Sequence, residues 1–261
     1  MAKPVTVTIA ENIATVLLNR PHAYNAFDFE LIESLAQYMT SLAADRNIRA
    51  VIISGEGKAF CAGGDLKYVL SMPQGPSAGF HELAARFHQA VLEIRRMPKP
   101  VIAAINGAAA GGGFSLALAC DFRVMAKSAF LRQAYTSNGL SIDGGGSFVL
   151  PRLVGLGRAL EIMAFDRPIS SEQAMAWGLV TKIVKDEDVI KEATEMAQEL
   201  ASGSSASFGW SKRLLTDSFD SSFETQIERE REGLSACAGT AEGMEGLKAF
   251  SEKRKPVFAS R

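Results

Sequence analysis

Two glycine-rich segments contain the residues whose types and spacing could do chemistry. They are residues 60–66 (FCAGGDL) and residues 106–113 (NGAAAGGG), and each follows a stretch typical of a β-strand. Backbone N–H groups at a strand-to-helix turn lack intrahelical partners, and with the helix dipole they favour a negatively charged oxygen. Two such turns that point at one oxygen would form an oxyanion hole, where each donor typically contributes about 3–4 kcal/mol in the transition state. Each segment could also be a plain tight turn, so the residues alone leave both roles open.

A third glycine cluster follows an acidic residue, in the run Asp143-Gly144-Gly145-Gly146. A carboxylate in a cavity can transfer protons, but aspartate is also a common turn residue before glycine. Neither role is excluded by the residues alone. A nucleotide site is not indicated, because residues 55–58 (GEGK) lack the spacing of a phosphate-binding loop and neither glycine segment has the dinucleotide-binding pattern.

The elements that would position these groups alternate between strand and helix. We predict strands at 5–9, 13–18, 51–53, 101–105 and 121–125, and helices after Asp28, near 80–96 and after the glycines at 111–113. Asp28 can cap its helix, whose apolar positions recur three or four residues apart: Phe29, Ile32, Leu35, Met39 and Leu42. The alternation predicts an α/β fold with short connections. After about residue 200 the pattern is helical only, which predicts two units, residues 1–200 and residues 201–261.

The composition excludes several classes of protein. Hydrophobic residues make up 47% of the 261 residues and charged residues 22%, which is typical of a globular chain with its own core. A net charge of −1 gives no indication of nucleic-acid binding, and no stretch approaches the ~20 apolar residues that a membrane span needs. The three cysteines are too few and too scattered for a disulfide framework or a zinc site. We therefore expect a cytoplasmic protein without a metal, without a nucleic-acid partner and without a membrane partner.

The order and flanks of the glycine segments resemble those of the crotonase family, also called the enoyl-CoA hydratase/isomerase superfamily. The resemblance covers nearly the whole chain, through residues 18–21 (LNRP), 60–66, 100–107 (PVIAAING), 111–113, 150–155 (LPRLVG) and 249–254 (AFSEKR). It implies a core of repeated ββα units arranged as a spiral, within residues 1–200. It also implies a helical trimerisation segment within residues 201–261, and a homotrimer or dimer of trimers as the assembly.

The same resemblance implies an acyl-CoA substrate, with coenzyme A as part of the substrate rather than a separate cofactor. The oxyanion-hole donors fall on the N–H groups of Gly64 and Gly112. The positions that match substrate-binding residues are Arg20, Ala62, Gly63, Gly64, Asp65, Leu66, Gly112, Phe250 and Lys253. Of these, Arg20 resembles a contact to a CoA phosphate, and Phe250 and Lys253 reach CoA from a neighbouring subunit in some members. Lys253 could equally be a solvated charge near the end of the chain.

The reaction depends on which acids and bases are present. Hydratase members of the family hold a water between two glutamates, and the matching positions here are Ser115 and Tyr135. A serine or tyrosine at its ordinary pKa is a poor base near neutral pH. Asp143 matches the single acid/base of the isomerase-type members, which move a double bond by removing a proton from one carbon and returning it at another. The leading prediction is therefore an enoyl-CoA isomerase with Asp143 as the acid/base.

Three alternatives stay open. One is a hydratase that holds water differently, through Asp143 or Tyr135. Another is a substitution at an aromatic ring, as in 4-chlorobenzoyl-CoA dehalogenase, where an aspartate at the Asp143 position attacks the ring and a histidine at the His88 position is the base. This chain departs from that enzyme at Gly64 and Tyr135, where the dehalogenase has an aromatic residue and a tryptophan. The third is a non-catalytic scaffold with the same fold. Residues 67–80 are expected to form a mobile loop that shapes the acyl pocket.

Overall fold

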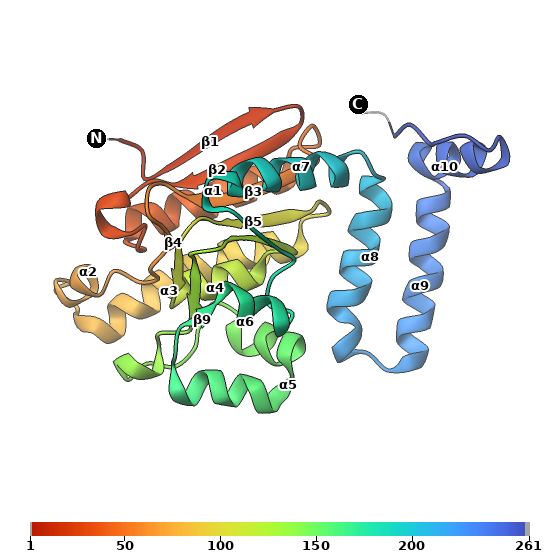
Figure 1. The fold of residues 1–261 in the computed structure, drawn as a ribbon. Coiled ribbons are helices and arrows are strands. Elements are labelled where there is room, and N and C mark those ends of the chain that lie inside the picture. Colours follow the sequence, from red (N-terminus) through yellow and green to blue (C-terminus); the bar gives the residue numbers. More distant parts are fainter. Residues whose placement is uncertain (1, 259–261) are drawn as a thin grey trace.

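Two β-sheets form the centre of the protein, in a computed structural model that describes residues 2–258 (Figure 1). The larger sheet has six strands in the order β1-β2-β3-β5-β7-β10, and the smaller sheet has four in the order β4-β6-β8-β9. Neighbouring strands are parallel except for the pairs β1–β2 and β8–β9. The strands are β1 (Val5–Ala10), β2 (Ile13–Leu18), β3 (Ala50–Gly55), β4 (Ala59–Cys61), β5 (Val101–Ile105), β6 (Ala108–Ala110), β7 (Phe122–Ala126), β8 (Phe130–Arg132), β9 (Ile169–Ser170) and β10 (Lys182–Val184).

Three consecutive segments of the chain repeat one structural unit. In each unit a first strand joins the larger sheet, a second strand joins the smaller sheet, and a helix follows. The first strands are β3, β5 and β7, which lie side by side, and the second strands are β4, β6 and β8, which also lie side by side. The predicted repeat of ββα units, and with it the α/β fold, is therefore confirmed.

The earlier helices cover the sheets, whereas the last three extend away from them. Their bounds are α1 (Phe29–Ala44), α2 (Leu66–Leu70), α3 (Gly75–Arg96), α4 (Gly112–Ala119), α5 (Gly146–Phe165), α6 (Ser171–Ala176), α7 (Val189–Ala201), α8 (Ser205–Asp217), α9 (Phe223–Ala238) and α10 (Ala241–Ser251). Short 3₁₀ turns are η1 (Pro21–Ala23), η2 (Thr136–Asn138), η3 (Asp186–Asp188) and η4 (Ser218–Asp220). Figure 1 shows α8, α9 and α10, in blue, standing to one side of the sheets.

Helix α1 forms for the reasons that its sequence predicts. The Asp28 carboxylate accepts a hydrogen bond from the Leu31 N–H at 2.9 Å, which caps the first turn. The positions Ile32, Leu35, Met39 and Leu42 are buried against the sheet and α3.

The helical C-terminal region is confirmed, and α8 is tied to the core by a buried cation. The Lys212 ammonium donates to the Ile94 carbonyl at 2.7 Å and to an Asp121 carboxylate oxygen at 2.8 Å. Arg49 similarly donates to the carbonyls of Ala201 and Gly203, where α7 gives way to α8. The predicted boundary at residue 200 lies at the end of α7 and stays a prediction.

The expectation of a loop over residues 67–80 is wrong for most of that stretch. Helix α2 begins at Leu66, because the Asp65 carboxylate accepts from the Tyr68 N–H at 3.1 Å and caps it. Helix α3 begins at Gly75, earlier than the predicted start near residue 80. Pro76 suits the first turn of a helix, where its missing N–H would have no partner.

Candidate active site

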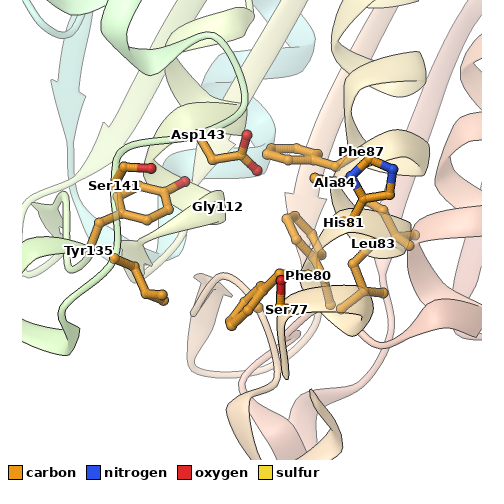
Figure 2. A pocket seen from close by; sticks show the side chains of 14 residues that line it. Ser77, Phe80, His81, Leu83, Ala84, Phe87, Gly112, Tyr135, Ser141 and Asp143 are labelled. Carbon is orange, nitrogen blue, oxygen red and sulfur yellow. The ribbon is translucent and has the colours of Figure 1, made fainter. Parts of the chain in front are cut away.

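A cavity of about 480 Å³ lies between α3 and the segment that runs from Tyr135 to Asp143 (Figure 2). Gly64 and Gly112, from the two glycine-rich segments, both line it. Figure 2 shows Asp143 and Tyr135 across the cavity from Phe80 and Phe87 of α3. Four residues that the sequence singled out for chemistry therefore line one cavity: Gly64, Gly112, Tyr135 and Asp143. His88, the candidate base, does not line it.

The two glycine-rich segments are in contact through their backbones. Gly63 has a φ of +90°, and a methyl group on it would lie 2.7 Å from the Gly112 nitrogen and 2.8 Å from the Ala110 carbonyl oxygen. Both the backbone conformation and the close approach require glycine. A methyl group on Gly113 would lie 2.1 Å from the Cys61 carbonyl oxygen, so α4 packs directly on β4.

The N–H groups of Gly64 and Gly112 are placed to act as donors. Gly112 is the first residue of α4, and the first N–H groups of a helix have no intrahelical acceptor. Around Gly64, the Phe27 N–H donates to the Gly63 carbonyl at 2.7 Å and the Asp65 N–H donates to the Phe27 carbonyl at 2.9 Å. The Gly64 N–H takes no part in these two hydrogen bonds. Within residues 2–258 it forms no other backbone hydrogen bond either.

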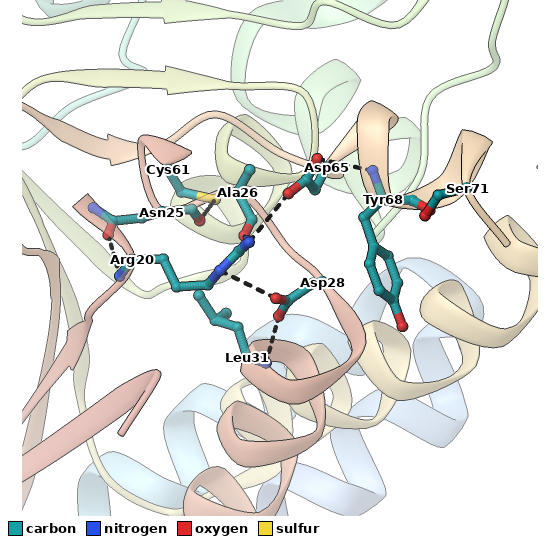
Figure 3. A network of polar contacts seen from close by, with 9 residues as sticks. All are labelled: Arg20, Asn25, Ala26, Asp28, Leu31, Cys61, Asp65, Tyr68 and Ser71. Carbon is teal, nitrogen blue, oxygen red and sulfur yellow. Dashed lines mark hydrogen bonds and ion pairs between the residues drawn. The ribbon is translucent and has the colours of Figure 1, made fainter. Parts of the chain in front are cut away.

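A network of polar contacts holds the first glycine segment in place (Figure 3). The Arg20 guanidinium donates to the Ala26 carbonyl at 2.6 Å and pairs with the carboxylates of Asp28 at 3.1 Å and Asp65 at 3.2 Å. Arg20 thus links Asp28, which caps α1, to Asp65, which caps α2. Because three protein acceptors already engage this side chain, its contacts support a role in holding the loop, and its predicted contact with a CoA phosphate stays a prediction.

Cys61 belongs to the same support. Its thiol donates to the Asn25 carbonyl at 3.2 Å and its sulfur accepts from the Gly63 N–H at 3.3 Å. Burial raises the pKa of the Cys61 thiol to about 12, more than the hydrogen bond from Gly63 lowers it. Cys61 therefore stays a neutral thiol at neutral pH and packs beside the cavity.

Asp143 is held at the edge of the cavity by the glycines that follow it. Gly144 has a φ of +61°, and a methyl group on it would lie 2.2 Å from Cε1 of Phe87. A methyl group on Gly146 would lie 2.9 Å from the Ser115 hydroxyl. The loop therefore rests on α3 and α4. One Asp143 carboxylate oxygen, Oδ1, lies 2.6 Å from Nε2 of His88 on α3, with both side chains partly open to solvent.

Ser115 and Tyr135, which were predicted to match the hydratase glutamates, form a neutral pair. Both residues are buried, and their hydroxyl oxygens lie 3.1 Å apart. Burial raises the pKa of the Tyr135 phenol above its ordinary value, and the nearby Asp143 carboxylate acts in the same direction, while the hydrogen bond with Ser115 opposes them. The phenol therefore stays protonated near neutral pH and cannot act as a base there.

Comparison with known proteins fits this arrangement. The sequence profile described as enoyl-CoA hydratase/isomerase matches residues 8–261. The chain belongs to the enoyl-CoA hydratase/isomerase family. It is 34% identical to the 1,2-epoxyphenylacetyl-CoA isomerase of Escherichia coli K12, with 97% of each chain covered. It is 31% identical to 4-chlorobenzoyl coenzyme A dehalogenase-2 of an Arthrobacter species, over 95% of this chain and 91% of the relative. A crystal structure of an enoyl-CoA hydratase from Bacillus anthracis superimposes with a TM-score of 0.92 at 34% identity, over 99% of this chain and all of that one.

The positions that match CoA contacts of the family fall into two groups. Ala62 and Leu66 are exposed beside the cavity-lining Gly64, where a ligand could reach them. Phe250 is 86% exposed on α10, and Lys253 follows the end of that helix. Neither of the latter two lines the cavity, and Figure 1 shows α10 and α2 on opposite sides of the molecule. A contact of Phe250 or Lys253 with CoA would thus need a neighbouring subunit, and it stays a prediction.

The sequence analysis did not predict the aromatic side chains that line this cavity. Phe27 and three positions on α3, namely Phe80, His81 and Phe87, line it. The signal was available, because residues 77, 80, 84 and 87 of α3 all face the cavity at helical spacing. The helix was predicted to begin near residue 80, so its first turns, which include Ser77, were left out.

Two further findings concern residues 2–258 only. In that part of the chain no three histidine, cysteine or acidic side chains come together as metal ligands would. Within the same residues, every helix is too short or too polar to span a lipid bilayer.

Proposed function

We propose that this chain is an enoyl-CoA isomerase that moves a double bond by proton transfer through an enolate, with Asp143 as the acid/base. The observation that carries the proposal is that the Asp143 carboxylate lines the same cavity as Gly64 and Gly112. The two positions at which family hydratases carry glutamates hold the neutral pair Ser115 and Tyr135 instead. One carboxylate is enough for double-bond migration, whereas water addition by the family's glutamate pair needs two.

The chemistry follows from the two sides of the cavity. A thioester carbonyl oxygen between the Gly64 and Gly112 N–H groups becomes negative when a proton leaves the adjacent carbon chain. Each aligned donor typically stabilises that charge by about 3–4 kcal/mol. Asp143 takes the proton from one carbon, which gives a dienolate and a protonated carboxyl group. It then returns the proton to another carbon, so the double bond moves and the enzyme is regenerated.

His88 would position the carboxylate in this reaction. Its Nε2 lies 2.6 Å from Asp143 Oδ1. A hydrogen bond to one carboxylate oxygen fixes the orientation of the side chain and leaves the other oxygen, Oδ2, for proton transfer. The 1,2-epoxyphenylacetyl-CoA isomerase relative supports the choice of an isomerase.

The substrate would bring coenzyme A with it, so we propose no separate cofactor. We also propose that the chain assembles as a homotrimer or a dimer of trimers, in the cytoplasm. Support for assembly comes from large apolar side chains that α8, α9, α10 and their connections leave exposed: Leu215, Phe219, Phe223, Ile227, Leu234, Met244, Leu247 and Phe250. Support for a reducing compartment comes from the three unpaired cysteines, Cys61, Cys120 and Cys237.

The decisive experiment compares Asp143→Asn with the unchanged protein. A 3-enoyl-CoA is supplied, and conjugation of the double bond with the thioester is followed by absorbance and product identification. We expect Asp143→Asn to lower kcat by about 10²–10⁴-fold, the usual contribution of a general acid/base, while thioester binding measured by calorimetry persists. Glu187→Gln, an exposed substitution in η3, is the matched control and should leave both quantities unchanged. An Asp143→Asn enzyme with full activity would refute the proposal.

A second candidate reaction is substitution at an aromatic ring, as the name of the Arthrobacter relative describes. The observation that favours it is the close contact between His88 and Asp143, which would suit a nucleophilic carboxylate and a base that activates water against the resulting ester. Halide release from 4-chlorobenzoyl-CoA tests it directly. Assay of a 2-enoyl-CoA for 3-hydroxyacyl-CoA tests hydration in the same series. Tight thioester binding without any of these three reactions would favour a non-catalytic scaffold.

A further inference from the structure

The segment 150–155 (LPRLVG) carries part of the family resemblance, but its charged residue, Arg152, has no place in the proposed reaction. Arg152 lies in α5 and lines a second cavity, of about 500 Å³, between α3, α5 and α8. Its volume is close to that of the cavity with Asp143, and no residue lines both cavities. The second cavity is therefore a separate candidate site.

The second cavity has an excess of positive charge. Four cationic side chains and two carboxylates line it: Arg95, Arg123, Arg152, Lys212, Asp121 and Asp220. Two of the cations already have buried partners, because Arg123 Nε donates to the Leu179 carbonyl at 2.6 Å and the Lys212 ammonium pairs with Asp121 at 2.8 Å. The cations that remain for a ligand are Arg95 and Arg152.

Arg95 and Arg152 lie against the same phenylalanine ring. Their guanidinium carbons are 4.7 and 3.4 Å from the centroid of the Phe148 ring. The two cations are thus closer together than the ~10 Å over which 0.1 M salt screens charge, so they repel each other. Arg95 lies 4.0 Å from the nearest oxygen of Asp217, and within residues 2–258 Arg152 forms no ion pair. An anion between the two guanidinium groups would relieve this repulsion.

Both guanidinium groups keep donors for such an anion. Arg95 Nη2 donates to the Thr216 carbonyl and Arg152 Nη1 donates to the Phe148 carbonyl, each at 2.7 Å. Their other nitrogens have no acceptor in the part of the chain that the structure describes. The Phe219 ring, 4.7 Å from the guanidinium carbon of Arg152, adds a second stacking contact. Stacked rings hold a guanidinium by its faces and leave the N–H donors at its edge open.

The remainder of the cavity is largely apolar. Large aliphatic side chains from α3, α5 and α8 line it: Val91, Leu92, Val149, Leu153 and Leu215. A small inorganic anion would leave this surface in contact with water. A ligand with a hydrocarbon tail would cover it, and the burial of apolar area favours binding.

We propose that the second cavity binds a carboxylate with an apolar tail, such as a medium-length fatty acid anion. Its two oxygens would accept from Arg95 and Arg152, because a carboxylate matches the fork of N–H donors that a guanidinium presents. Its tail would lie against the aliphatic side chains of α3 and α5. This site is independent of the reaction proposed above, because it shares no lining residue with the cavity of Asp143.

Calorimetry with three small probes tests the chemistry of the site. We expect octanoate to bind at one site per chain with a Kd below about 1 mM. Acetate keeps the charge without the tail, and octylammonium keeps the tail with the opposite charge, so each should bind at least about tenfold more weakly. Equal affinities for octanoate and octylammonium, or for octanoate and acetate, would overturn the proposal.

Substitutions then show which cavity holds octanoate. Arg152→Gln removes a charge at an exposed position, and we expect octanoate affinity to fall about tenfold or more, the size of a hydrogen bond to a charged group. Leu92→Glu adds a negative charge to the apolar lining at a position that is 42% exposed, and it should also weaken octanoate binding. Unchanged affinity in both variants, with thermal unfolding unaltered, would place octanoate elsewhere and overturn the site.

Arg167→Gln is the matched control for Arg152→Gln. Arg167 is also exposed and its guanidinium carbon lies 5.0 Å from the centroid of the Phe165 ring, but it lines neither cavity. Its replacement should leave octanoate affinity unchanged.

A second copy of the chain is the other occupant to test, because Leu215 and Phe219 also belong to the apolar surface that supports assembly. In that case octanoate would not bind, and Arg152→Gln would lower the assembled mass measured by light scattering. That result would overturn the carboxylate site. Octanoate binding by the assembled protein, lost in Arg152→Gln while the mass stays the same, would establish it.

Discussion

Two walls of the cavity differ in the groups that they present: one presents backbone N–H groups and the other presents side chains. The wall that would hold the enolate oxygen consists of backbone N–H groups at glycine turns, where Gly112 is buried and Gly64 is half-buried. The wall that would move the proton presents the Asp143 side chain, which is 36% exposed and contacts His88, a residue outside the cavity lining. The first wall can change only if the backbone changes, whereas the second can change by a single substitution on a loop or a helix face.

This difference explains how one family can hold several reactions. Stabilising an enolate is a requirement common to proton transfer and water addition on a thioester, and it depends on the backbone wall. Under the proposed function, the choice among reactions would depend on the side chains near the thioester, here Asp143 in contact with His88. Relatives at 31–34% identity accordingly carry the names of an isomerase, a dehalogenase and a hydratase.

The largest loss of activity and stability is expected when the contact between the two glycine-rich segments is disrupted. Gly63→Ala would put a side chain at a φ of +90° and within 2.8 Å of two backbone atoms. Forcing an L-residue into positive φ costs about 1–2 kcal/mol, and displacement of the neighbouring Gly112 N–H should lower kcat by about 10²–10³-fold. Thermal unfolding and turnover of a 3-enoyl-CoA measure the two effects separately.

Gly157→Ala provides the comparison for that substitution. Gly157 lies in α5, where a methyl group would meet no atom within 4 Å, and its φ is not positive. We expect unchanged activity and a free energy of unfolding higher by about 0.5–1 kcal/mol, because alanine favours the helix. Equal activity of Gly63→Ala and Gly157→Ala would show that the contact between the glycine segments does not matter for catalysis.

The backbone wall could be predicted from the sequence, because only a few residue types fit its turns. Paired glycines after strands indicated both turns, and the glycine run after Asp143 indicated the third. The capping of α1 by Asp28 could likewise be predicted from the neighbouring residues. The capping of α1 and the positive φ of Gly63 and Gly144 are local causes, whereas the close approach of Gly63 to Gly112 is not.

The other parts of the site depend on contacts between distant segments, and no local pattern contains them. Arg20 bonds to Asp65, and His88 meets Asp143, in each case across dozens of residues. The start of α3 was placed too late because residues 75–79 contain glycine and proline, which usually end helices. Here Gly75 and Pro76 form the first turn instead, and residues 77 and 80 reach the cavity as a result.

A smaller loss of activity is expected when His88, which contacts Asp143, is replaced. His88→Gln removes the imidazole at 2.6 Å from Asp143 but leaves the carboxylate itself in place. We expect kcat to fall by about tenfold, the size of one lost hydrogen bond to a charged group, with KM unchanged. His22→Gln, an exposed substitution in η1, should alter neither constant. A loss in kcat comparable to that of Asp143→Asn would instead assign His88 a direct part in proton transfer and strengthen the ring-substitution reaction.

The smallest effect is expected at Tyr135, which lines the cavity on the same side as Asp143. The phenol is buried, and its raised pKa keeps it neutral, so it would serve the site only through its hydrogen bond with Ser115. Tyr135→Phe should lower the free energy of unfolding by about 1 kcal/mol and change kcat by no more than a few-fold. Ser115→Ala should behave alike, and the double variant should cost little more than either one, since the two hydroxyls are partners. A loss of 10²-fold or more in Tyr135→Phe, with stability retained, would mean that the phenol contacts the reacting atoms. Tyr135 would then join Asp143 in the chemistry, and the side-chain wall would no longer depend on a single acid/base.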